Sequence, residues 1–148
     1  MRRTELPDKP LMLDTDIHLG FMHGTNEVFN NLMDYLLFKT SDWEILFCEG
    51  LRKQIERNLK RYQIGIHLYY RHVYHRFDQF NKIKFGEESS LPPKCYVSHK
   101  NDRIIVACAV GSKSKILISE DGRLELSPEC GIQKMTAGEF LEAYQNGN

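Results

Sequence analysis

The stretch that decides the fold is residues 101–124, NDRIIVACAVGSKSKILISEDGRL. Its apolar run over residues 104–110 predicts a buried helix, opened by the carboxylate of Asp102. Gly111 and a basic turn end this helix, and residues 116–118 predict a short buried strand that leads to Asp121. One acid lies at the start of this helix and the other lies just past the end of the strand. Both carboxylates can therefore meet at the carboxyl edge of a parallel sheet, where open α/β sheets place their sites.

A second strand near the start of the chain ends in the same way. Residues 11–14, LMLD, are apolar up to Asp14, and Asp16 follows two residues later. A strand without polar alternation is typical of the centre of a parallel sheet, which is buried on both faces. We therefore expect Asp14 to reach the same edge as Asp102 and Asp121.

The rest of the pattern completes an α/β domain. Parallel strands need crossover connections, so the order of elements predicts a three-layer α/β/α sandwich around a central parallel sheet. Residues 1–10 are expected to be a flexible lead-in, and residues 11–148 one domain. Further helices are expected over residues 26–39, over residues 51–80 as one long helix or as two helices joined near Gly65, and from Thr136 onward. Strands are expected over residues 43–48 and 132–134, and loops over residues 18–24 and 84–97.

Composition excludes several classes of function. The 148 residues carry 20 basic and 20 acidic side chains, so net charge gives no argument for nucleic acid. No apolar run approaches the roughly 20 residues of a membrane span, and the first residues lack the apolar core of a signal peptide. Four scattered cysteines without a CxxC pair predict reduced thiols rather than a disulfide framework or a zinc site. We therefore expect a cytoplasmic protein that makes no membrane contact.

Three motifs resemble those of the PIN domain, a family of metal-dependent ribonucleases that includes many toxins of toxin–antitoxin modules. MLDTD is similar to the opening strand, with Asp14 in the catalytic position and Asp16 where asparagine is usual. NDRIIVACAV is similar to the acid followed by an Ala-x-Ala helix, with Asp102 as the acid. ILISED is similar to the strand followed by Thr-x-Asp, with Ser119 in place of threonine and Asp121 as the acid. The closing segment GIQKMTAGEFLEAY also fits, so the resemblance covers roughly residues 11–145 in element order.

The resemblance implies a Mg²⁺- or Mn²⁺-dependent endoribonuclease that hydrolyses RNA phosphodiester bonds. Asp14, Asp102 and Asp121 would be its catalytic residues and metal ligands, since carboxylate oxygens suit these hard ions. The resemblance to the toxins of the family also implies that this chain has a protein partner or inhibitor. A homodimer is a further expectation. The same acids also fit another kind of acidic-site phosphodiesterase, one that acts on DNA flaps or on small phosphoesters.

One position departs from the family pattern. Gln54 stands where the family carries a fourth acid, a glutamate on the helix after the second strand. Glu49 is the candidate for a displaced fourth metal ligand, while Asp16, Ser119 and Gln54 are expected to lie beside the ligands and support them. The missing charge motivates an alternative, an activity-reduced PIN-like module that binds nucleic acid or a protein partner.

A basic helix face follows the second strand. It is expected to bind the RNA backbone through Arg52, Lys53, Arg57, Lys60 and Arg61. A solvated helix face explains the same pattern equally well. Taken singly, the aspartates also fit helix caps and a turn, but three acids at predicted sheet ends favour a site.

Overall fold

In the computed structural model, which describes residues 9–146, five parallel strands form one sheet in the order β3-β2-β1-β4-β5. β1 lies at the centre, and its register with β4 pairs Leu13 with Ile118. The strands are β1 (Lys9–Leu13), β2 (Trp43–Phe47), β3 (Ile83–Phe85), β4 (Ile116–Ile118) and β5 (Gln133–Met135).

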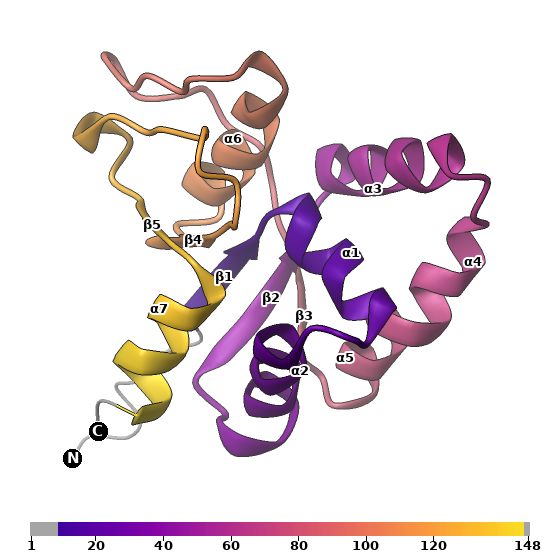
Figure 1. The fold of residues 1–148 in the computed structure, drawn as a ribbon. Coiled ribbons are helices and arrows are strands. Elements are labelled where there is room, and N and C mark those ends of the chain that lie inside the picture. The colour runs from indigo at the N-terminus through magenta and orange to yellow at the C-terminus, as the bar shows by residue number, and fades with distance from the viewer. Residues whose placement is uncertain (1–8, 147–148) are drawn as a thin grey trace.

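Helices flank this sheet (Figure 1). α6 packs on β1 and β4 and contacts α3, whereas α7 packs on β5 and contacts α2. This arrangement confirms the predicted α/β fold with a central parallel sheet. The helices are α1 (Thr15–His23), α2 (Glu27–Asp34), α3 (Glu49–Arg61), α4 (Ile66–Tyr69), α5 (His75–Gln79), α6 (Arg103–Gly111) and α7 (Ala137–Leu141), with π-helical turns at Tyr35–Lys39, Tyr70–Tyr74 and Glu142–Asn146.

The chain changes direction across the sheet between β1 and β4. From β1 the strand order runs outward through β2 to β3, and from β4 it runs the other way to β5. Loops that leave β1 and β4 at their carboxyl ends therefore diverge to opposite sides. Such a switch point leaves a crevice in which α/β proteins bind ligands.

Three expectations about local structure are wrong. Residues 18–24, expected to be a loop, mostly belong to α1, where Gly20 is a packing residue because a Cβ atom there would collide with the Phe29 ring. β3 overlaps the expected loop over residues 84–97, and its half-exposed edge position explains the weak apolar signal. Lys9 and Pro10 open β1 instead of belonging to a lead-in, while residues 1–8 lie outside the described part of the chain.

None of the helices within residues 9–146 is both long enough and apolar enough to cross a membrane.

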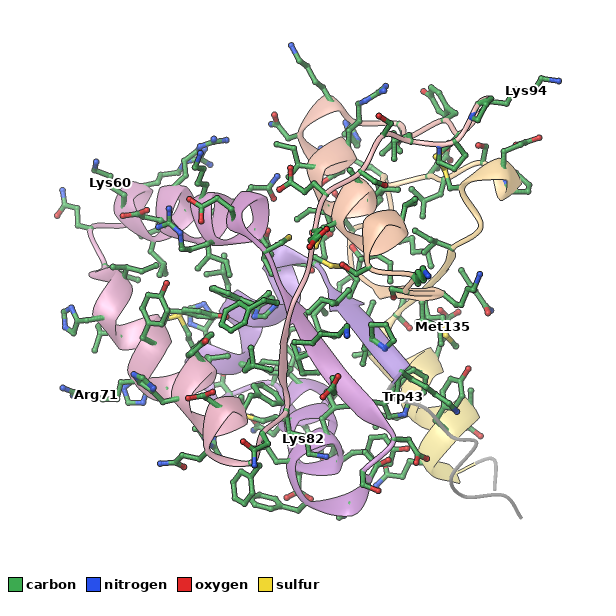
Figure 2. The ribbon with its side chains drawn as sticks, turned by 180° about the vertical axis from the view of Figure 1, so that it is seen from behind. Trp43, Lys60, Arg71, Lys82, Lys94 and Met135 are labelled. Atoms are coloured by element: carbon green, nitrogen blue, oxygen red, sulfur yellow. A yellow bond between two sulfur atoms is a disulfide. The ribbon has the colours of Figure 1, made fainter. Side chains whose placement is uncertain are left out.

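The expectation that all four cysteines are reduced is wrong for one pair. Cys95 and Cys130 form a disulfide (Figure 2), whereas Cys48 and Cys108 are buried free thiols. A bridge between Val97 and Leu126 brings the two loops together, a contact that cysteine spacing does not show. Disulfides persist mainly in oxidising compartments, so this pair weighs against the expected cytoplasmic location, which stays a prediction.

Reduction should destabilise the protein by about 2–4 kcal/mol, because the disulfide joins residues 35 positions apart and restricts the unfolded chain. Urea unfolding with and without reductant measures the loss, and a Cys95→Ser/Cys130→Ser variant should be insensitive to reductant. Alkylation of the denatured, unreduced protein should label two thiols. Labelling of all four would show that the disulfide is absent.

Candidate active site

A cleft of about 440 Å³ opens where the strand order switches. The three predicted aspartates, Asp14, Asp102 and Asp121, all line it, and Asp16 lines it beside them. They come from the β1–α1 junction, the start of α6 and the loop after β4. The structure therefore brings together in one cleft the acids that the sequence places at three separate points.

Asp14 is the most firmly held of these acids. It is 6% exposed, its Oδ1 accepts a hydrogen bond from the Thr15 backbone N–H at 2.7 Å, and its Oδ2 accepts one from Ser119 Oγ at 2.7 Å. The Ser119 hydroxyl oxygen also accepts the backbone N–H of Asp121 at 3.1 Å. One buried hydroxyl thus links Asp14 to the loop that carries Asp121, which agrees with its expected supporting position.

Asp16 is held at one oxygen only. Its Oδ2 accepts the backbone N–H of Glu120 at 3.0 Å, while its Oδ1 is buried and has no hydrogen-bond partner among residues 9–146. Burial, followed by repulsion from Asp14, raises the pKa of Asp16 from 3.8 to about 7. Near neutral pH, Asp16 therefore shares its time between the protonated and ionised forms.

The remaining acids differ in charge state. Burial, followed by repulsion from Asp14 and Asp121, raises the pKa of Asp102. Burial also raises the pKa of Asp14, although hydrogen bonds from Ser119 and Thr15 oppose the shift. The backbone N–H of Arg123, 2.9 Å from Asp121 Oδ1, lowers the pKa of Asp121. Asp121 is consequently the acid most readily ionised.

Capping and turn formation explain only part of this arrangement. Asp14 does cap α1, and Asp121 does accept a backbone hydrogen bond within its turn. Asp102 precedes α6 but makes no side-chain capping bond. Its carboxylate faces the cleft without that structural role.

The donor set fits a hard divalent cation in its chemistry. Within residues 9–146, no three His, Cys, Asp or Glu side chains lie close enough, as placed, to form a metal-binding group. Four aspartates nevertheless line the cleft, and their carboxylate oxygens are its acidic donors. These oxygens match the preference of Mg²⁺ and Mn²⁺, and a cation would relieve their mutual repulsion.

Gln54 lines the cleft, as its predicted register requires, but both ends of its amide are occupied. Its Oε1 accepts the Thr15 hydroxyl at 2.9 Å, and its Nε2 donates to the Asn101 carbonyl oxygen at 2.6 Å. Gln54 thereby connects α3 to the start of α1 and to the segment that carries Asp102. Its position is one of support, with no free oxygen directed to the cleft.

Glu49 lies apart from the aspartates. It accepts hydrogen bonds from Arg52, the shorter at 2.7 Å, and it lines a separate depression that also contains Cys48 and Lys53. The hydrogen bonds from Arg52 lower the pKa of Glu49. The structure therefore does not bring the expected fourth ligand together with the other three.

The five basic residues expected to bind RNA divide into two groups. Arg57 and Arg61 line the cleft beside the acids. Arg52 is engaged by Glu49 and Glu56. Lys53 lines the depression that contains Glu49, and Lys60 lies at the end of α3 farthest from the sheet (Figure 2).

Sequence reasoning missed several residues of the cleft. His99, Asn101 and Arg123 line it, as do Leu19 and Asn58. The asparagine at 58 follows Gln54 by four residues on α3, a helical spacing that was available in the sequence. The loop residues His99 and Arg123 follow no such period.

Comparison of the chain with models of known protein families finds no match, and a search among curated proteins finds none either. The cleft and the motifs that form it are therefore the features of the chain that bear on its function.

The metal-free protein should lose stability as pH rises from about 4 to 7. In this range the folded chain retains a proton on Asp16 that the unfolded chain has released, because the pKa is about 7 in the fold and 3.8 ordinarily. Bound protons in excess in the native state make stability fall with pH. Asp16→Asn should flatten this fall in urea unfolding measured in EDTA, whereas Asp78→Asn, at an exposed position on α5, should not. Equal slopes of the unfolding free energy against pH in wild type and Asp16→Asn would contradict the raised pKa of Asp16.

Gln54→Glu should exchange a structural hydrogen bond for a metal ligand. In EDTA the variant should lose about 1–3 kcal/mol, since a carboxylate oxygen would face the Asn101 carbonyl oxygen that Nε2 now bonds. Added Mn²⁺ should narrow this deficit, because the new charge strengthens cation binding. Gln54→Leu, which removes the hydrogen bonds without adding charge, should show a deficit that Mn²⁺ does not narrow. The same response in both variants would place residue 54 outside the reach of the cation.

Proposed function

We propose that this chain is a divalent-metal-dependent endoribonuclease that hydrolyses RNA phosphodiester bonds in the aspartate cleft. The observation that carries the proposal is the meeting of four aspartates at the switch point of the sheet, with Arg57 and Arg61 on the adjoining wall. Acids alone would repel a polyanion. Acids beside arginines suit a phosphate whose charge is shared between a cation and guanidinium groups.

Each residue then has a distinct task. Asp14, Asp16, Asp102 and Asp121 would hold Mg²⁺ or Mn²⁺, which as a Lewis acid supplies charge stabilisation at the scissile phosphate. Ser119 keeps the Asp14 carboxylate and the Asp121 backbone at a fixed separation. Arg57 and Arg61 lie one helical turn apart on α3 and bind phosphate oxygens along the strand.

Cation binding in the cleft should depend on pH, because it changes the number of bound protons. Ligand carboxylates must be ionised, so cation binding displaces the proton that Asp16 retains near pH 7. Metal affinity should consequently rise as pH increases through this range. Asp121, with its lowered pKa, is ionised throughout.

A second candidate function is favoured by a separate observation, the hydrogen bonding of Gln54. Gln54 supplies no negative charge, and its two hydrogen bonds hold it in a supporting position. A cleft that lacks the carboxylate of the family pattern at position 54 suits an activity-reduced module that binds nucleic acid or a protein. The resemblance to PIN-domain toxins adds a protein inhibitor and a homodimer to the proposal.

A nuclease assay on mixed single-stranded and structured RNA separates these candidates. The proposal expects internal cleavage with Mn²⁺ or Mg²⁺ and none in EDTA. Asp14→Asn and Asp121→Asn should each lower the rate by about 100-fold, the size of effect expected when an electrostatic stabiliser of the reacting centre is removed. Asp34→Asn, outside the cleft, should retain the wild-type rate.

The opposite outcome is equally specific. RNA binding without cleavage, and without any rise in thermal stability on addition of Mn²⁺, would favour the binding module. Cleavage in EDTA at the wild-type rate would exclude a metal-dependent mechanism.

A further inference from the structure

A second pocket, of about 750 Å³, adjoins the cleft and is lined by α1, the end of α3, α4 and the π-helical turn that follows α4. Its floor is apolar. It is formed by Leu19, Met22, Leu59, Ile64 and Leu68. The size is in the range of pockets that bind small organic groups.

The pocket and the cleft share a wall. Leu19 and Asn58 line both of them. Arg57 and Arg61 of α3 line the cleft, while Asn58 on the same helix and Tyr62, the residue directly after its end, line the pocket. Side chains four residues apart lie on one helix face, so two parallel rows result, one cationic and one neutral.

The lining selects an uncharged, partly polar occupant. Among the described residues that line the pocket, none is Asp, Glu, Lys or Arg. Asn58, His23 and His72 add hydrogen-bonding groups to the lining, and Tyr62 is 68% exposed. A flat heterocycle with an apolar face and a polar edge satisfies the floor, these polar groups and the tyrosine ring together.

We propose that this pocket receives an unpaired nucleobase of an RNA strand whose neighbouring phosphates contact Arg57 and Arg61. The inference rests on the proposed function, because it takes RNA as the occupant of the cleft. Tyr62 stacks on the base, and the adjoining side chains contact its edge. The enzyme would then require single-stranded RNA at this position, since a paired base cannot leave its stack to enter.

Binding of two fluorescent oligonucleotides tests the pocket. One is a ten-nucleotide single-stranded RNA and the other an abasic RNA backbone of the same length, both measured by anisotropy in Ca²⁺ with RNA integrity checked on a gel. Tyr62→Ala should weaken binding of the base-bearing RNA about 5- to 150-fold, which corresponds to about 1–3 kcal/mol for one stacked base. It should leave the abasic backbone unaffected, and Tyr62→Phe, which retains the ring, should bind like wild type. Tyr96→Ala removes a tyrosine that is 60% exposed outside the pocket and serves as the matched control.

A variant that fills the pocket with a larger side chain tests the same inference independently. Leu68→Trp, with folding verified by circular dichroism, should reduce the affinity for the base-bearing RNA and spare the abasic backbone. Unchanged RNA affinity in both Tyr62→Ala and Leu68→Trp would overturn the inference and leave the pocket to another occupant, such as an apolar side chain of a protein. Equal weakening of both oligonucleotides by Tyr62→Ala would overturn it too.

Charge variants separate this result from a failure of the proposed function. Arg57→Gln/Arg61→Gln should weaken binding of both oligonucleotides and flatten the salt dependence by about one unit per lost phosphate contact. Lys53→Gln/Lys60→Gln makes the same change in net charge away from the cleft and should do neither. If wild type binds neither oligonucleotide, the RNA proposal itself fails. If it binds both with the arginine effect but without the Tyr62 effect, only the base pocket fails.

Discussion

The hydrogen bond from Ser119 Oγ to Asp14 Oδ2 is the interaction on which the cleft depends. Both partners are buried at the ends of two neighbouring strands, β1 and β4, that are far apart in the sequence. A buried carboxylate without such donors costs several kcal/mol, so this bond and the Thr15 N–H make the position of Asp14 tolerable. The pairing of Leu13 with Ile118 sets the register that makes the bond available.

Repulsion among the acids is the cost of this arrangement. The pKa values of Asp14, Asp16 and Asp102 are raised, by burial first and by neighbouring carboxylates second. A chain selected for stability alone would replace some of them, because unpaired buried charge destabilises a fold. Perturbed acids gathered in one crevice are instead typical of functional sites. The disulfide joins Cys95, in the loop before Asp102, to Cys130, in the loop after Asp121, and so stabilises the segments that carry these two acids.

α3 connects the acidic cleft to the remainder of the surface. Gln54 fixes the helix against α1 and against the segment before α6 through two hydrogen bonds. With that orientation set, the residues one turn further on line the cleft and the apolar pocket. A single helix thereby presents a supporting amide, an arginine row and a neutral row, and its rotation about its own axis decides which row faces which cavity.

The sequence by itself determined the fold class, the strands β1, β2 and β4, and the identity of the four aspartates that line the cleft, because these features depend on apolar periodicity and on acids at element ends. It did not determine that α1 is a helix, that Cys95 meets Cys130, or that Gln54 supports the cleft through two hydrogen bonds. Nor did it show that Glu49 turns away to Arg52, or which two of the five basic residues face the acids. Each of these depends on contacts between segments distant in the chain, or on the rotation of a helix against its neighbours. Local propensity carries no information about such contacts, and only the packed tertiary structure decides them.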